Sequence, residues 1–207
     1  MHRCGAVLPR IGEQKPRHSD HFNQSTVKDM LRRGINVYVG ENVYDDMIDK
    51  CDIRGISRLV MHEKKKVGQF LIQPFEVAHN VPNCGFLIIT PTKERLVFVT
   101  DAVECNYKFR DLDCILVECN HDDDTLIENF VENDVSMSHP EHHMGLDDCR
   151  NFCKANVSLN TKQIILIHMS HTNINENYAV ETIRQATNIN VAVAHKGDKF
   201  EIENDDF

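Results

Sequence analysis

Hydrophobic residues recur in short runs from Phe70 onwards, and most of these runs are rich in Val, Ile, Leu and Phe. Pro, Asn and Lys separate the runs, which is the pattern of consecutive β-strands joined by turns. Four of the predicted strands follow one another directly, and two more come later as buried strands. They span residues 70–80, 84–90, 95–101, 114–120, 163–168 and 190–194.

Helical spacing of apolar residues marks the segments before and between these strands. In residues 23–33, Val27, Met30 and Leu31 share one helical face, and Gly34 follows as a stop signal. Because strands and helices alternate, we expect an α/β fold with helices packed outside a sheet or a pair of sheets. The other predicted elements are a strand at 36–39 with a helix after it, and helices at 122–132, 146–156 and 175–187.

The composition narrows the class of protein. The 207 residues are 41% hydrophobic and no linker or repeat divides them, so residues 1–207 are predicted to form one domain. No apolar run approaches the roughly 20 residues of a membrane span, and no signal-peptide core is present, so we expect a cytoplasmic protein without a membrane partner. The net charge of −9 argues against broad electrostatic binding of nucleic acid. The eight cysteines are expected to be thiols, with Cys149 and Cys153 packed in the core.

Residues with metal-binding side chains stand at the ends of several apolar runs. His79, Asp101 and His168 each close such a run, and Glu118 interrupts another. Burying an imidazole or a carboxylate beside apolar strands is costly unless the group is paired or bound to a metal. A single strand-end histidine is more simply interpreted as a satisfied core residue, but four such positions together favour a site.

A second cluster, His18-Ser-Asp20-His21, precedes the first predicted helix. Its two imidazoles and one carboxylate can converge on one or two cations. Taken alone, the tetrapeptide is explained equally well as a polar turn in which Asp20 caps the helix. The strand-end residues shift this balance towards a metal centre. Twelve histidines in a chain without tryptophan agree, because neutral imidazole is the commonest protein ligand for metals such as zinc.

These motifs together resemble the metallo-β-lactamase superfamily, from about Pro16 to about Gly197. The similarity is to a small bacterial and phage branch related to ribonuclease Z and to YycJ-type hydrolases. The family's T-H-x-H-x-D-H motif is matched by Lys15-Pro-Arg-His-Ser-Asp-His21, and its G-I-x-V-Y by Gly34-Ile-Asn-Val-Tyr38. Later motif positions are matched by His79 in PFEVAHN, Asp101 in FVTDA, Glu118 in VECNHD, His143 in HHMGLDDCRNFCKAN and His168 in LIHMSHTN.

The resemblance implies an αββα sandwich with two divalent metal ions, zinc in the first instance, with manganese or iron as alternatives. One ion would be held by His18 and His79, the other by Asp20, His21 and His168, with Asp101 bridging the pair. A shared hydroxide would attack the substrate and Asp20 would orient it. His143 with Glu118 would deliver a proton to the leaving oxygen, and His139 and His142 stay open as alternatives to His143.

The chain departs from the family pattern at its beginning. Pro16 stands where the family has the first histidine of its motif, and the two segments that precede this motif in the family are absent. Proline has no ligand atom, so the first metal site is expected to be the weaker one. The first sheet is expected to lack its leading hairpin, and an exposed edge there is compatible with a homodimer.

The predicted function is metal-dependent hydrolysis of a small phosphodiester or nucleotide, as a nuclease or a cyclic-nucleotide phosphodiesterase. Within the resemblance, Glu118 and His143 favour this chemistry because they belong to the phosphodiesterase branch. Two alternatives stay open. One is a truncated, catalytically inactive metal-binding or interaction module, and the other is a lactonase or thioesterase that uses the same centre on an acyl substrate.

Overall fold

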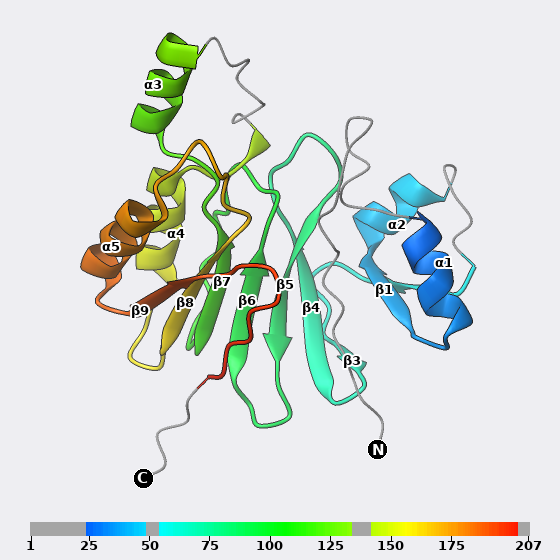
Figure 1. The fold of residues 1–207 in the computed structure, drawn as a ribbon. Helices are drawn as coiled ribbons and strands as arrows, with labels where there is room; N and C mark the ends of the chain where they lie inside the picture. Colours follow the sequence, from blue (N-terminus) through cyan, green and yellow to red (C-terminus); the bar gives the residue numbers. More distant parts are fainter. Residues whose placement is uncertain (1–23, 49–53, 134–141, 203–207) are drawn as a thin grey trace.

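A seven-stranded mixed sheet forms the centre of the molecule (Figure 1). The computed structural model describes residues 24–48, 54–133 and 142–202. The strands follow one another in chain order across the sheet: β3–β4–β5–β6 pair antiparallel, and β6–β7–β8–β9 pair parallel. Their bounds are β3 Lys65–Val67, β4 Phe70–Glu76, β5 Cys84–Ile89, β6 Arg95–Val99, β7 Cys114–Glu118, β8 Gln163–Ile167 and β9 Asn190–Val193.

The hydrophobic core lies between one face of this sheet and two helices, α4 (Leu146–Asn156) and α5 (Glu176–Thr187). Alternate residues of the central strands, such as Val97, Ile115 and Ile164, point into it and are fully buried. Asn175 caps the start of α5, because its side chain accepts a hydrogen bond from the Tyr178 N–H, and Asn188 caps its end in the left-handed conformation. The thiols predicted to pack in the core do so, since Cys149 and Cys153 are completely buried.

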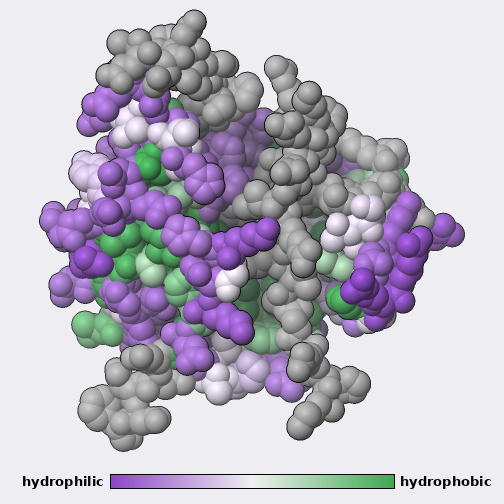
Figure 2. All heavy atoms as spheres, viewed as in Figure 1, coloured by the Kyte–Doolittle hydropathy of each residue, from purple (hydrophilic) through white to green (hydrophobic). Residues whose placement is uncertain are grey.

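A smaller unit lies beside β4, on the right in Figure 1, and contains two helices and a two-stranded parallel sheet. Gly34, with φ +73°, ends the first helix as predicted. The outward surface of that helix is hydrophilic (Figure 2). The elements are α1 Gln24–Arg32, β1 Val37–Gly40, α2 Glu41–Met47 and β2 Ile56–Leu59.

The remaining helix, α3 (Asp123–Asn133), stands away from the sheet at the top of Figure 1. Asp122 caps its first turn, because the Oδ1 atom accepts a hydrogen bond from the Thr125 N–H. Within the described residues, no helix is both long and apolar enough to cross a bilayer.

Strand direction explains why the polar residues at the ends of the apolar runs come together in space. β4, β6, β7 and β8 all run the same way, because β4 and β6 are each antiparallel to β5 and the later strands are parallel. Their carboxyl ends therefore meet at one edge of the sheet. The residues that follow these ends are the ones that the sequence singled out.

Candidate metal centre

Four acidic and imidazole side chains converge at this edge of the sheet. Glu118 is the last residue of β7, His168 directly follows β8, and Asp101 lies two residues beyond β6. His143 comes from the segment that leads into α4. One potential ligand atom from each residue lies within 4.8 Å of every other, so the group can hold a metal ion. Its members are Asp101, Glu118, His143 and His168.

Glu118 joins the two histidines of this group. Its Oε1 atom accepts a hydrogen bond from Nδ1 of His143 at 2.6 Å and another from Nδ1 of His168 at 2.7 Å. The second oxygen, Oε2, accepts from the Ala102 N–H at 2.9 Å. The side chain is fully buried, and these three donors compensate for the loss of water around the carboxylate.

The hydrogen bonds also determine the charge of Glu118. Burial raises the pKa of its carboxyl, but the bonds from His143 and His168 outweigh burial and hold that pKa below its ordinary value. Glu118 is therefore ionised near neutral pH. Because a carboxylate only accepts, Nδ1 of both histidines carries the proton, and in the neutral rings the lone pair lies on Nε2.

The 2.6 and 2.7 Å contacts show that Glu118 can belong to the group by supporting the two imidazoles. They are hydrogen-bond distances, and the oxygen that makes them is already shared by two donors. A carboxylate that orients a metal-binding imidazole through its second nitrogen is a common arrangement around metals. This geometry fits His168 as the ligand and Glu118 as its support.

His79 lies against the same group. Its ring centroid is 6.1 Å from that of His143, and its Nδ1 donates to the backbone carbonyl of His142 at 3.0 Å. A carbonyl cannot donate, so this bond places the proton on Nδ1 and the lone pair on Nε2. The loops after β4 and β6 are joined by the Val103 N–H, which donates to the Ala78 carbonyl at 2.8 Å.

Asp101 and His168 share an unusual backbone. Both have positive φ angles, +51° and +54°, in the left-handed region that side-chain-bearing residues rarely adopt. Such conformations cost free energy and persist where surrounding contacts enforce them, often at functional sites. Asp101 is 6% exposed, so its carboxylate is also held in a mostly buried position.

The donor set of the described residues suits a divalent cation. It offers imidazole nitrogens from His79 and His168 and a carboxylate from Asp101, the ligand types of zinc, manganese and iron sites. Of the predicted site residues, the structure brings together His79, Asp101, Glu118, His143 and His168. His18, Asp20 and His21, together with Pro16 and the alternative His139, lie outside the described residues.

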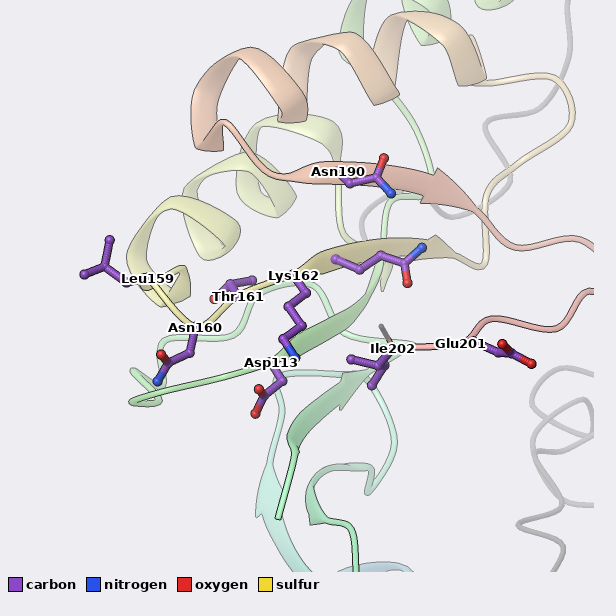
Figure 3. Close-up of a pocket in the computed structure, with 9 residues that line it drawn as sticks. Asp113, Leu159, Asn160, Thr161, Lys162, Asn190, Glu201 and Ile202 are labelled. Atoms are coloured by element: carbon purple, nitrogen blue, oxygen red, sulfur yellow. The ribbon is translucent and has the colours of Figure 1, made fainter. Parts of the chain in front are cut away.

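A hollow among the described residues lies away from this centre. It has a volume of about 730 Å³, and polar residues such as Asp113, Lys162 and Asn190 line it together with Leu159 and Ile202 (Figure 3). Asp113 precedes β7 whereas Glu118 ends it. Five residues of extended strand place the hollow roughly 16 Å from Glu118, at the opposite edge of the sheet.

A family model described as the beta-lactamase superfamily domain matches residues 16–169. The chain belongs to this superfamily. The match covers the strand ends that carry His79, Asp101, Glu118 and His168, and it includes His143. The fold is that of the superfamily, and with the cluster at the sheet edge it is a metallo-hydrolase fold with a metal-binding group.

Solved structures of the superfamily fold superpose on most of the chain at low sequence identity. The metallo-beta-lactamase fold protein YhfI from Bacillus subtilis is 15% identical with a TM-score of 0.61, and the match covers 87% of this chain and 73% of that one. Igni18, a metallo hydrolase from Ignicoccus hospitalis, is 15% identical with a TM-score of 0.56 and coverages of 89% and 77%. No curated protein matches the chain.

A third superfamily structure, a possible metal-dependent hydrolase from Veillonella parvula, is 15% identical with a TM-score of 0.57 and coverages of 87% and 71%. At this identity the three structures support the fold alone. The superfamily therefore supplies the architecture of the site, and the chemistry has to be argued from the side chains of this chain.

Sequence patterns did not reveal the backbone contacts of the centre. The carbonyl of His142 orients His79, and the side-chain amides of Asn83 and Asn120 bond to backbone carbonyls in the loops that carry Asp101 and His168. Asn83 follows Pro82 and Asn120 follows β7, so each reads as an ordinary turn residue. The positive φ angles that make these contacts meaningful are visible only in the structure.

Proposed function

We propose that this protein is a metal-dependent hydrolase that cleaves a phosphodiester, with two divalent metal ions held by His18, Asp20, His21, His79, Asp101 and His168. The observation that carries the proposal is the double hydrogen bond of Glu118 to His143 and His168. One buried carboxylate orients two imidazoles at the same sheet edge, beside Asp101.

The metal ions supply Lewis acidity, polarising the scissile ester and lowering the pKa of a bound water. The chain's own residues divide the remaining work. The carboxylate of Asp101 lies beside the imidazole of His168, with 3.5 Å between Oδ1 and Nδ1, so the two proposed ligand residues are neighbours. His79 adds an imidazole whose Nδ1 proton is held by the His142 carbonyl.

His143 is the proposed proton donor. Its Nδ1–H donates to Glu118, so Nε2 is the atom at which a proton can be held and then given to the leaving oxygen. The bond from Nδ1 to Glu118 also limits rotation of the ring, which keeps Nε2 in one position. His142 is a poorer candidate, because its described contacts are with His79, through the backbone carbonyl and an edge-on ring, and do not include the Glu118 carboxylate.

A phosphodiester fits this arrangement better than a thioester, because an alkoxide leaving group needs a proton from a placed acid and a thiolate does not. The His143–Glu118 pair provides that acid. A thioesterase would use the same metal ions without requiring this pair. The identity of the metal, zinc first and manganese or iron next, and a homodimeric state remain predictions.

The test is a substrate panel of a dinucleotide, bis-p-nitrophenyl phosphate and p-nitrophenyl esters with three variants. Asp101→Ala should lose both metal and turnover. His143→Ala should retain metal and lose about 10²–10⁴-fold in turnover of the dinucleotide, whose alkoxide leaving group needs a proton, and much less with bis-p-nitrophenyl phosphate, whose p-nitrophenolate leaves without one. His171→Ala, at an exposed position, is the control and should match the unmodified protein. If no form of the protein cleaves either phosphodiester and His143→Ala still cleaves the esters, the results favour the acyl hydrolase.

A further inference from the structure

Two asparagines make the same contact to the two candidate ligands that have left-handed backbones. The side-chain Nδ2 of Asn83 donates to the Asp101 carbonyl at 2.7 Å, and Nδ2 of Asn120 donates to the His168 carbonyl at 2.9 Å. Asp101 and His168 are the two residues of the metal-binding group with positive φ. The two amides come from different loops, so a common local motif does not explain the repetition.

We propose that Asn83 and Asn120 are positioning residues that act through Asp101 and His168. A left-handed backbone turns the carbonyl away from its usual direction, and a donor is needed to keep it there. Each asparagine supplies that donor and so favours the one backbone conformation that brings the carboxylate or the imidazole to the group. The inference rests on the proposed function in one respect, namely that the side chains of Asp101 and His168 are metal ligands.

Asn83 is itself held on several sides. Its amide also donates to the Thr100 carbonyl at 2.9 Å, its Oδ1 accepts from the Cys84 N–H at 2.8 Å, and its carbonyl accepts from Asn42 Nδ2 at 2.7 Å. The side chain therefore joins the start of β5 to the end of β6. Because both the NH₂ group and the oxygen of its amide are hydrogen-bonded, the Asn83 side chain has little freedom to move away from Asp101.

Asn120 connects the two histidines that Glu118 orients. Its N–H donates to the Met144 carbonyl at 2.8 Å, next to His143, and its carbonyl accepts from the Ser170 N–H at 3.0 Å, two residues after His168. The side-chain amide adds the bond to the His168 carbonyl. The backbone bonds of Asn120 join the loops that carry His143 and His168, and they remain when the side chain is changed. A substitution that removes only the side-chain amide therefore tests what that amide contributes at His168.

A matched control, Asn129 of helix α3, contacts the loop that carries His168. Asn129 also donates its Nδ2 to a backbone carbonyl, that of Thr172, at 2.6 Å. Thr172 is four residues from His168, but it does not belong to the metal-binding group and its φ is not positive. Asn129→Asp therefore removes the same kind of bond without touching a candidate ligand.

The experiment measures Zn²⁺ affinity by competition with a chromophoric chelator in Asn83→Asp, Asn120→Asp and Asn129→Asp. Aspartate keeps the size of asparagine but replaces the donor with a charged acceptor that repels the carbonyl. We expect affinity to fall about 10- to 100-fold in the first two variants, which is the usual effect of losing an outer contact of a metal ligand. Asn129→Asp should bind Zn²⁺ as the unmodified protein does.

A double-mutant cycle separates positioning from general destabilisation. In a His168→Ala background, Asn120→Asp should have little further effect on affinity, because the residue through which it acts is gone. Equal losses in both backgrounds would overturn the inference. Should Asn120→Asp fail to fold, Asn120→Ser keeps a smaller side chain at the position and takes its place in the cycle.

A second readout does not depend on metal. In the metal-free protein, the His168 Nδ1–H proton bonded to Glu118 should give a downfield NMR resonance that is shifted or lost in Asn120→Asp and kept in Asn129→Asp. If the unmodified protein binds no Zn²⁺, the proposed function is refuted. The NMR resonance would then still test whether Asn120 positions His168. Protein that binds Zn²⁺ equally in all three aspartate variants would refute the positioning and leave the proposed function standing.

Discussion

Glu118 connects three parts of the candidate centre, because its two oxygens accept from His143, His168 and the Ala102 N–H. Glu118→Gln cannot accept two imidazole protons with the same strength, and it leaves one ring poorly paired in a buried position. We expect a loss of about 3 kcal/mol in the free energy of unfolding, the scale for breaking a buried ionic pair. Denaturant titration measures it.

The control for this substitution is Glu76→Gln. Glu76 also contacts a histidine, His62, at 2.7 Å, but both side chains are about half exposed. A pair in water contributes under about 1 kcal/mol. Equal losses in Glu118→Gln and Glu76→Gln would contradict the view that the buried carboxylate organises the site.

His121 gives a prediction for pH dependence. Its side chain is buried, Nδ1 has no hydrogen-bond partner among the described residues, and burial lowers its pKa below the usual 6.5. A depressed pKa stabilises the fold above pH 6.5, and that stability is lost as the pH falls through the lowered value, because the unfolded chain binds the proton first. The melting temperature should therefore fall between about pH 7 and pH 5.

Replacing this histidine should flatten that profile. His121→Asn cannot be protonated, so its melting temperature should change less over the same pH range, whatever its value at pH 7. The exposed His171→Asn serves as the control and should keep the slope of the unmodified protein. A slope that is unchanged in His121→Asn would show that another group causes the dependence.

At the scale of single residues, the sequence predicts which side chains meet but not how they bond. His79, Asp101, Glu118 and His168 could be found because each interrupts or ends an apolar run, which is costly without a partner. That Glu118 contacts both histidines depends on the rotation of two side chains from separate loops. No periodicity in a sequence encodes such an arrangement.

At the scale of elements, β5 packs closely against a neighbouring aromatic ring. A Cβ atom added at Gly85 would lie 2.4 Å from Cζ of Phe75 and 3.0 Å from the Phe98 carbonyl oxygen. Gly85→Ala should therefore destabilise the protein by roughly 1–3 kcal/mol through overpacking. Thermal unfolding of Gly85→Ala, Phe75→Leu and the double variant measures it.

The two substitutions should not add. Phe75→Leu removes the ring atoms that the new methyl group would meet, so Gly85→Ala should cost less in that background. Additive losses would mean that the Phe98 carbonyl, rather than the ring, opposes the methyl group.

The elements that sequence patterning predicted best are those with strong periodicity or long apolar runs. The helix predicted at 146–156 is present as α4 with the same bounds, and the strands predicted from 70 to 120 are β4 to β7. β2 and β3 were not predicted. β3 contains two lysines in three residues, and both strands are too short to show alternation. Pairing with neighbouring strands, rather than their own composition, forms them.

At the scale of the whole molecule, the order of the strands assembles the site. Residues 79 and 168 are far apart in the chain, yet parallel strand directions bring their loops to one edge of the sheet. The sequence predicted the α/β class from the alternation of elements, and the αββα architecture followed from the family resemblance. The order of seven strands in one sheet required the structure, because pairing over long separations leaves no local signal.

The measurement that tests the central claim most directly is metal content by plasma mass spectrometry, made beside a phosphodiester assay before and after chelation. We predict two divalent ions per chain, loss of bis-p-nitrophenyl phosphate turnover on chelation, its return with added Zn²⁺ or Mn²⁺, and neither full occupancy nor turnover in Asp101→Ala. Turnover that survives complete removal of metal, or a protein that holds at most one ion and turns over nothing, would contradict a binuclear hydrolase.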